Sequence, residues 1–516
     1  VPDDAHIVVV PHTLGLGAIL AGLAAVPFLG INDFYLQILF TIGVNYIAAA
    51  GLNVLVGYAG QKSLGHAGLF AVGAYTAAIA NVDFGIGPWL SLVIACVMGA
   101  LFGLVIAAPS VRVSGPSLAM VTIGFGIVVE KIVTEWTDLF KGQAGIYGIA
   151  APSFLGKSFT NLHWVIFVGL LSLALHLLFR SLLSGRFGRA FLAVQLAEPA
   201  AESVGISVVK AKTLAFVISA VTCALAGALV AQQNQYFNSD FITFNLSIFL
   251  LVVVIFGGSG SLYGPLLGSL VLTLLDAWLA RWPALQHFTY GALLLFALYL
   301  MPNGLAGALA RFFPAKTGGR AGQGASRALA PVTVEKHGEP LLTVSGLYKA
   351  YGGIVPVKEV SFTIHPGKVH ALIGPNGAGK TTLLNLLSGH VPEDRGTVMF
   401  AGRDITTLPA NRVASAGISR TFQNLKLFGH LSALDNVLIG AHLHVGTGFA
   451  PALLGLPGNR RAEARAREEA LALLSELGLG ERAFDPANSL PYGLQRRLEI
   501  ARALASRPRL LLLDEP

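Results

Sequence analysis

GPNGAGKTT, at residues 374–382, matches the pattern G-x-x-x-x-G-K-[ST] of phosphate-binding loops. The run VHALI at 369–373 directly precedes it and predicts a buried strand, and a helix is predicted near 379–389. Glycines let successive backbone N–H groups close around phosphate oxygens, and the N-terminus of the helix favours the same anion. The stretch therefore predicts a nucleotide-binding site at a strand–loop–helix junction.

Two side chains of this loop are expected to contact the phosphates or their metal ion. Lys380 is expected to reach the β- and γ-phosphates, and the Thr381 hydroxyl is expected to hold Mg²⁺. The alternative interpretation is a glycine-rich turn that carries Lys-Thr by chance. The predicted nucleotide-binding residues of the loop are Gly374, Asn376, Gly377, Ala378, Gly379, Lys380, Thr381 and Thr382.

A second acidic element is needed to complete such a site. The sequence RLLLLDEP at 509–516 supplies an apolar strand that ends in two acids. Asp514 is expected to contact Mg²⁺, directly or through water, and Glu515 to polarise the attacking water. Together the two elements predict a site that binds a nucleotide with Mg²⁺ and can direct water at its phosphates.

The part of the chain before residue 311 differs in composition. The whole chain is 54% hydrophobic and 12% charged, with a mean hydropathy of +0.67, which argues against a soluble enzyme. Residues 1–310 hold 11 basic and 11 acidic side chains, so the net charge of +8 falls entirely in 311–516. No basic stripe interleaved with aromatic residues occurs, so nucleic acid is not expected as a partner.

Apolar runs long enough to cross about 30 Å of hydrocarbon recur through residues 14–306 and predict a polytopic α-helical membrane domain of about ten spans. Lysine and arginine cluster at 180–212 and 311–327, which indicates that both segments are cytoplasmic. Ten spans then place the N-terminus in the cytoplasm and the loop at 136–162 outside. The predicted spans are 14–31, 34–58, 64–81, 89–109, 117–135, 163–179, 213–231, 243–257, 265–280 and 288–306.

Polar residues within the spans leave alternatives open. A charge in hydrocarbon costs about 2.5–3.5 kcal/mol on insertion scales. Glu130, Lys131 and Glu135 therefore either line a solute pathway or lie at the outer end of a helix, where they reach the headgroups. Asp276 has the same two interpretations. His66 is expected to be a packed, hydrogen-bonded histidine rather than a proton carrier.

These patterns divide the chain into three predicted parts. Residues 1–310 form the transmembrane domain, 311–340 a flexible cytoplasmic linker of glycine, alanine, serine and charged residues, and 341–516 the nucleotide-binding α/β domain. The loop at 180–212 mixes small, apolar and charged residues at helical spacing. It predicts an amphipathic helix at the membrane surface, which either docks on a soluble partner or lies at the interface without one.

Two further motifs, RTFQN at 420–424 and LPYGLQRRLEIARAL at 490–504, lie between the phosphate loop and LLLLDEP. The order and spacing of the four motifs resemble the ATP-binding subunit of ABC transporters. The resemblance implies that Gln423 acts in catalysis with Glu515 and senses Mg²⁺ and the membrane domain, and that Tyr351 stacks on adenine. It also implies a signature that caps ATP on the opposite subunit, formed by Leu490, Pro491, Tyr492 and Gly493. The metal-binding residues implied are Thr381, Gln423 and Asp514.

The membrane part resembles the permease subunits of branched-chain amino-acid importers. Four stretches carry this likeness, and the third of them is implied to be the cytoplasmic coupling segment. In this family the permease and the ATPase are usually separate chains, whereas here they are fused. The four stretches are GYAGQKSLGHAGLFAVGAYTAA (57–78), SGPSLAMVTIGFG (114–126), FGRAFLAVQLAEPAAESVGI (187–206) and FGGSGSLYGPLLGS (256–269).

This resemblance implies a multi-pass subunit of an ATP-driven importer in the bacterial inner membrane, with the ATP-binding domain in the cytoplasm. Branched-chain amino acids, or a similar small amino acid or amide, are the implied substrates. The implied partners are a second permease subunit, a second ATP-binding subunit, an extracytoplasmic solute-binding protein and the lipid bilayer. The alternatives are an importer of urea or short amides, an exporter, and a membrane-tethered ATPase without transport activity.

The sequence departs from the family pattern in two places. Pro491 stands where the signature commonly has serine or alanine, and Leu494 stands where it has an amide, so capping of the opposite ATP is expected to be weaker. The chain also stops at Pro516, directly after the acidic pair. We therefore expect a partial ABC domain, incomplete at its C-terminus, and a chain that is inactive alone.

Overall fold

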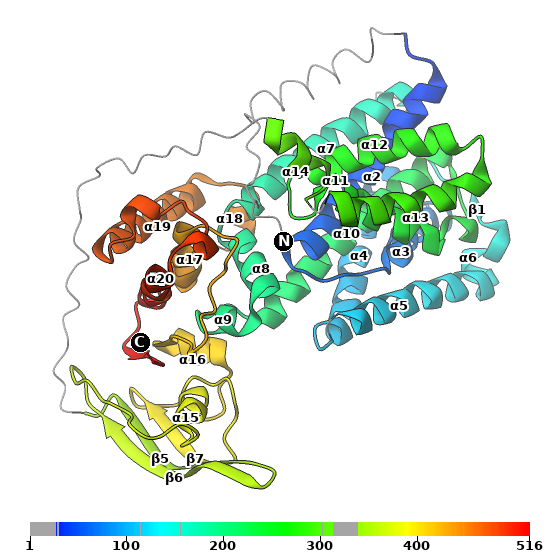
Figure 1. Cartoon of the computed structure of the whole chain (residues 1–516). Helices are drawn as coiled ribbons and strands as arrows, with labels where there is room; N and C mark the ends of the chain where they lie inside the picture. The colour runs from blue at the N-terminus through cyan, green and yellow to red at the C-terminus, as the bar shows by residue number, and fades with distance from the viewer. Residues whose placement is uncertain are drawn as a thin grey trace. The chain divides into compact units, whose positions relative to one another are not determined.

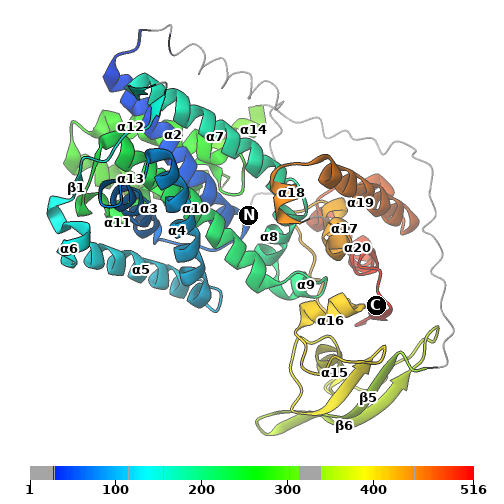
Figure 2. The same ribbon diagram turned by 180° about the vertical axis from the view of Figure 1, so that it is seen from behind.

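The computed structural model describes residue 27 and residues 30–113, 115–154, 156–301, 303–312, 339–446 and 448–515. The chain forms two compact units. The first unit comprises Val1–Leu182 and Val209–Lys316, and the second comprises Leu183–Val208 and Thr317–Pro516. The segment that resembles a coupling segment therefore belongs to the second unit. Figures 1 and 2 show the elements of each unit from opposite sides.

The first unit is a bundle of apolar helices. Among the described residues, six segments are long and apolar enough to cross a membrane, and two shorter apolar helices accompany them. The prediction of about ten spans is not confirmed, and the predicted span 14–31 lies almost wholly outside the described residues. The six segments are Asp33–Tyr58, which contains α2 (Asp33–Asn53) and the π-helix η2 (Val54–Tyr58), α4 (Pro88–Ser110), α5 (Pro116–Glu135), α7 (Asn161–Leu183), α10 (Val208–Asn234) and Ser239–Gly258, which contains α11 (Phe244–Gly258).

Other elements complete this unit. The shorter apolar helices are α3 (His66–Val82) and α12 (Gly264–Leu279), followed by α13 (Pro283–Leu300) and α14 (Gly304–Phe312). The predicted outer loop contains the single-turn helix α6 (Thr137–Phe140) and short antiparallel strands. Strand β1 (Ile146–Tyr147) pairs with β4 (Tyr236–Phe237), and β2 (Ser153–Phe154) pairs with β3 (Lys157–Ser158).

Small residues let the helices around α10 approach more closely than larger side chains would allow. A Cβ on Gly73 of α3 would lie 1.9 Å from the carbonyl oxygen of Ala224, and a Cβ on Gly227 of α10 would lie 2.0 Å from that of Phe70. A Cβ on Gly99 of α4 would lie 2.6 Å from the Ala224 methyl group. Lipid tails are as apolar as leucine, so helices in a bilayer associate through such close packing. These glycines explain how α10 can be buried against both α3 and α4.

The sequence predicts close helix packing or broken helices at two glycine-rich turns, 57–68 and 257–265, and in the structure these two turns contact each other at Gly57 and Gly260. The helical segment α2–η2 stops at Tyr58, and the chain resumes as a helix at α3 after the irregular stretch 59–65. Asn53 holds the second turn, because its Nδ2 donates to the Ser261 carbonyl at 2.9 Å and its Oδ1 accepts from the Gly260 N–H at 2.9 Å. The first turn is therefore a broken helix fixed by the second.

Polar groups of the bundle have identified partners. His66 is fully buried, with Nε2 2.7 Å from the Ser219 hydroxyl oxygen, as expected for a packed histidine. Asp276 accepts a hydrogen bond from the Tyr290 hydroxyl. Glu130 and Lys131 form an ion pair at 4.0 Å with both side chains largely exposed, so their two interpretations stay predictions.

The second unit contains a four-stranded antiparallel sheet in the order β6-β5-β7-β8. Strand β5 (Leu342–Tyr351) pairs with β6 (Ile354–Ile364) and with β7 (Arg395–Phe400), and β8 (Arg403–Asp404) pairs with β7. Alternating apolar residues bury one face of β5 against α15 (Lys380–Leu387) and α16 (Ala410–Ala416). This core supports the first turn of α15, where the phosphate loop ends.

A two-stranded parallel pair and a helical region complete the second unit. Strand β9 (Ile418–Arg420) lies parallel to β10 (Leu510–Leu512). A separate apolar core joins α17 (Ala433–Gly440), α19 (Pro457–Glu476) and α20 (Tyr492–Ala505). The short helices α8 (Arg186–Leu196) and α9 (Glu198–Glu202) contact α17 and α16 respectively, and α18 (Phe449–Leu453) precedes α19 (Figures 1 and 2).

The structure corrects two local predictions. The run 369–373 was predicted as a buried strand, but no strand of the described chain pairs with it, and Val369 and Ile373 are almost completely exposed. An apolar run becomes a strand only where a neighbouring strand satisfies its backbone groups, and here none does. The sequence also predicts that the helix after the signature starts near residue 495, but α20 begins at Tyr492, so part of the signature forms its first turn.

Candidate nucleotide site

The phosphate loop has a conformation that depends on its glycines. Gly377 and Gly379 have φ angles of +85° and +86°, in the left-handed region that other residues rarely adopt. A Cβ on Gly379 would also lie 2.1 Å from the Pro356 carbonyl oxygen. Lys380, the first residue of α15, donates from Nζ to the carbonyl oxygens of Gly374 and Pro375 at 2.7 and 2.8 Å. The ammonium therefore lies within its own loop, at the N-terminus of a helix.

The predicted acidic residues lie beside the predicted glutamine. Strand β10 ends before Asp514, and the Asp514 N–H donates to the Thr421 hydroxyl at 3.2 Å. Glu515 accepts from Gln423 Nε2 at 3.2 Å. Burial raises the pKa of the Asp514 carboxyl, and the Lys380 ammonium is among the positive charges that oppose this rise. The structure thus brings together four of the predicted residues, namely Lys380, Gln423, Asp514 and Glu515.

Asp514 has the properties of a metal ligand. Its side chain is buried, and its Oδ2 accepts no hydrogen bond from the described residues, while the Arg420 guanidinium lies 3.6 Å away. Burial raises the pKa of this carboxyl, against the opposing effect of Arg420. A buried oxygen with spare acceptor capacity, next to a threonine-bearing phosphate loop, suits Mg²⁺. The residues present therefore fit a magnesium–nucleotide complex.

A buried charge network that the sequence analysis did not identify supports these residues. Glu499 of α20 is completely buried, pairs with Arg496 and Arg502 at 3.1 and 3.6 Å, and accepts from the Phe422 N–H at 3.2 Å. Arg496 also donates to the carbonyl oxygens of Phe422 and Gln423 at 2.7 and 3.0 Å. The network thus fixes the backbone from which the Gln423 side chain projects. Opposite charges three residues apart in α20 were the sequence signal for it.

The remaining predicted residues lie apart from this group. Tyr351 ends β5 with its ring half-exposed, and Lys349 Nζ lies 5.5 Å from the ring centroid. In the signature, Leu490 is buried, Pro491 is the N-cap of α20, and Tyr492 and Gly493 are exposed in its first turn. No hydrogen bond or ion pair joins these five residues to Lys380 or Asp514 within the described chain. Thr381 and Thr382 lie in the first turn of α15.

His390 links the segment 183–208 to the nucleotide site. Its Nε2 donates to the Pro199 carbonyl oxygen at 3.1 Å, and its ring meets Phe422 edge-on at a centroid distance of 5.7 Å. His390 lies three residues after the end of α15, and Phe422 directly precedes Gln423. Burial lowers the pKa of His390, which keeps the imidazole neutral. One side chain therefore contacts α9, the end of the phosphate-loop helix and the glutamine segment.

This fold and site define an ATP-binding cassette of the ABC type, joined in one chain to an apolar helical membrane domain. A family model described as ABC transporter matches residues 357–516. The model described as branched-chain amino acid transport system / permease component matches residues 34–298, half of the chain. The chain belongs to this permease family and carries an ABC transporter domain as well.

The relatives of the two parts are different proteins. Over 177 residues the chain is 44% identical to the high-affinity branched-chain amino acid transport ATP-binding protein BraF of Pseudomonas aeruginosa, covering 34% of this chain and 69% of that protein. It is 41% identical over 178 residues to LivG, the corresponding protein of Escherichia coli K12, covering 34% and 70%. It is 32% identical over 320 residues to the permease protein LivM of the same organism, covering 57% and 75%.

These matches define the class of protein to which the chain belongs. It is a membrane protein of an ABC transporter, and its ATP-binding domain binds ATP and couples ATP hydrolysis to transport. Relatives of both kinds belong to transporters of several subunits, so this chain works with partner permease and ATPase subunits.

Proposed function

We propose that this chain is a fused permease and ATP-binding subunit of an importer that moves branched-chain amino acids inward across the bacterial inner membrane. The observation that carries the proposal is that one chain is similar to LivM in its first part and to BraF and LivG in its second, and all three are named for branched-chain amino acid transport. The domains are residues 1–310 and 341–516, joined by the linker 311–340.

The nucleotide site suggests a role for each of its side chains. Lys380 and the N-terminus of α15 hold the phosphates, and the glycines of the loop allow the backbone to approach them. Thr381, Gln423 and Asp514 would hold Mg²⁺, which would supply positive charge next to the phosphates when it is bound. Glu515, hydrogen-bonded to Gln423 at 3.2 Å, orients and polarises the attacking water. Tyr351 stacks on the adenine.

The same contacts suggest how hydrolysis reaches the membrane domain. Any movement of Gln423 displaces Phe422, whose ring lies against His390, and His390 holds the Pro199 carbonyl of α9. Residues 187–206 then act as the coupling segment. The signature residues 490–493 lie at the N-terminus of α20, where Pro491, Tyr492 and Gly493 are exposed and face the ATP of a second ATP-binding subunit.

Assembly and location follow from this role. One copy supplies one permease and one ATPase, so a second of each completes the transporter. An extracytoplasmic solute-binding protein delivers the substrate. The basic segments at 180–212 and 311–327 support a cytoplasmic location for the ATP-binding domain.

The test is uptake into proteoliposomes that contain the complete transporter and its binding protein, with radiolabelled leucine and, in parallel, urea. We expect ATP-dependent leucine uptake that the substitution Lys380→Ala abolishes, because the phosphates lose their principal cation. Lys358→Ala, which changes a lysine of the strand β6, is the matched control and should transport normally. Uptake of urea but not leucine would identify the short-amide importer, and ATP hydrolysis without any uptake would identify a tethered ATPase.

A further inference from the structure

Helix α8 begins without a cap from its own sequence. Its N-cap residue is Gly185, which has no side chain to accept a hydrogen bond from the first turn. The Arg186 N–H instead donates to Glu463 Oε1 at 2.7 Å, although Glu463 lies 277 residues further along the chain, in α19. The orphan donors of a helix N-terminus favour a carboxylate. Glu463 therefore caps α8 from another element.

The second oxygen of the same carboxylate is also used. Arg189 Nη2 donates to Glu463 Oε2 at 2.6 Å, and the Arg189 and Glu463 side chains are only 11% and 18% exposed. A charge-assisted hydrogen bond at this burial is much stronger than a surface ion pair. Both oxygens of one carboxylate thus hold α8, one through its backbone and one through a side chain.

Neighbouring contacts place the start of α8 on the same part of the second unit. The Arg186 guanidinium donates to the Val445 carbonyl oxygen, and Phe187 meets Phe449 of α18 edge-on at a centroid distance of 5.6 Å. Val445, Phe449 and Glu463 all lie between α17 and the middle of α19. This attachment is separate from the contact of α9 with His390, which involves the phosphate-loop side of the unit.

We propose that Glu463 is a positioning residue for coupling: it fixes the start of α8 to α19, so that movements of the helical region during the ATP cycle are passed to the coupling segment. This inference rests on the proposed transport function. Within the described part of the chain, the hydrogen bonds of Glu463 go to α8 and none goes to the nucleotide site. Its loss therefore separates transport from ATP hydrolysis rather than abolishing both.

The experiment compares variants of the complete transporter in proteoliposomes, with leucine uptake and ATP hydrolysis measured on the same preparation. For Glu463→Ala we expect ATP hydrolysis within about twofold of the unchanged transporter, but about tenfold less leucine moved per ATP, the factor expected from one charge-assisted hydrogen bond. Arg189→Ala should show the same separation, and the double variant should be no worse than Glu463→Ala. Glu463→Gln, which keeps an acceptor for the Arg186 N–H, should lie between.

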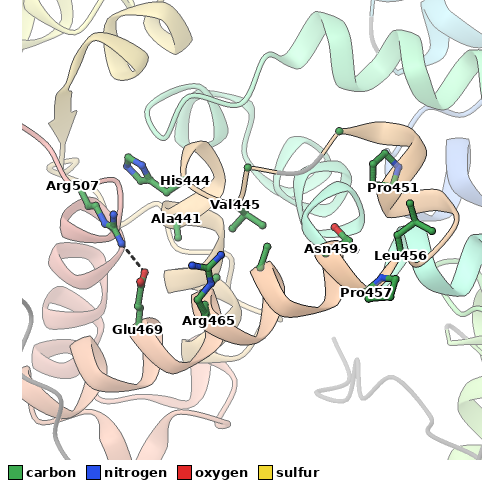
Figure 3. A pocket seen from close by; sticks show the side chains of 15 residues that line it. Ala441, His444, Val445, Pro451, Leu456, Pro457, Asn459, Arg465, Glu469 and Arg507 are labelled. Atoms are coloured by element: carbon green, nitrogen blue, oxygen red, sulfur yellow. Dashed lines mark hydrogen bonds and ion pairs between the residues drawn. The ribbon is translucent and has the colours of Figure 1, made fainter.

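Glu469→Ala is the matched control. Glu469 lies six residues further along α19 and pairs with Arg507 at 2.8 Å with both side chains half-exposed, at the wall of a cavity of about 830 Å³ that Figure 3 shows. This change removes an α19 carboxylate without touching α8, so the ratio of leucine to ATP should stay unchanged. An equal fall in the ratio for Glu469→Ala, or an unchanged ratio for Glu463→Ala, would overturn the proposal.

A second readout does not depend on the substrate. Amide hydrogen exchange at 186–189 should be faster in Glu463→Ala than in Glu469→Ala, because the N-terminus of α8 loses its cap, and Glu463→Gln should lie between the two. If the unchanged transporter moves no leucine, the proposed function fails, and this exchange still tests the attachment. Unaltered exchange would refute the attachment even where transport is normal.

Discussion

The interior of the first unit and the interior of the second unit are stabilised in different ways. In the first unit, helices approach through positions that lack side chains, such as Gly73 and Gly227, and apolar surface covers the rest. The second unit has apolar cores as well, but it also buries paired ions such as Glu499 and Arg502. The difference reflects the surroundings: helices in a bilayer gain little from burying apolar surface against each other, whereas a unit in water gains enough to offset buried charge.

The largest effect on the packing of the first unit is expected where a side chain is added at the closest approach between two helices, α3 and α10. In Gly73→Leu the new Cβ would lie 1.9 Å from the Ala224 carbonyl oxygen, which is too close. The two helices must therefore separate. We expect a loss of several kcal/mol, enough to prevent assembly. The measurement is the yield of monodisperse transporter by size-exclusion chromatography in detergent.

The control for this change is Gly124→Ala in α5, where a Cβ would meet nothing within 4 Å. It should leave the yield and thermal stability nearly unchanged. If Gly124→Ala lowers the yield as much as Gly73→Leu does, the effect of these glycines comes from their backbone conformation. Close helix packing would then not explain why glycine is needed at these positions.

The corresponding test in the second unit removes a buried ion. Glu499→Ala leaves Arg502, which is almost completely buried, without its carboxylate, and burial already lowers the pKa of Arg502 to about 10. Breaking a buried pair in this way costs about 3–5 kcal/mol. We expect a fall in the melting temperature of the ATP-binding part. Differential scanning calorimetry measures this temperature.

The matched surface change is Asp485→Ala, which removes the partner of the exposed Arg482 at 3.9 Å. An exposed pair contributes about 0–1 kcal/mol, so little change is expected. Equal effects of Glu499→Ala and Asp485→Ala would mean that burial of the charge is not what matters.

The smallest expected effect is a dependence on pH. Burial, reinforced by Arg186 and Arg189, lowers the pKa of His442 to about 3, from an ordinary value of about 6.5. Between these values the unfolded state binds more protons than the folded state, so stability is full above pH 6.5 and declines as the pH falls toward 3. The protection of residues 186–196 against hydrogen exchange, measured relative to the intrinsic exchange rate at each pH, should therefore be weaker at pH 5.5 than at pH 7.5.

Substitution of His442 by glutamine tests this explanation. The variant should lose part of the difference between the two pH values, because its side chain does not titrate. Were the variant to keep the full difference, another group would be responsible for the acid sensitivity of α8.

Prediction from the sequence succeeded where the pattern is local. The phosphate loop, the strand that precedes Asp514 and most of the apolar helices are each encoded within a short stretch, and the structure has them. The run 369–373 failed because a strand depends on a neighbouring strand, which a local pattern does not supply. The role of Glu463 could not be predicted either, because it depends on contacts with Arg186 and Arg189. These residues are far away in the sequence, and no spacing rule connects them to Glu463.

The membership of residues 183–208 in the second unit has a consequence for affinity. In a transporter of separate subunits, the ATPase must bind its docking segment tightly enough to withstand dilution. Here one polypeptide carries both surfaces, so the docking segment faces its partner at an effective concentration of about millimolar. Weak docking then suffices for full occupancy, and a contact such as that of α8 with α19 is free to open and reclose in each cycle without loss of the subunit.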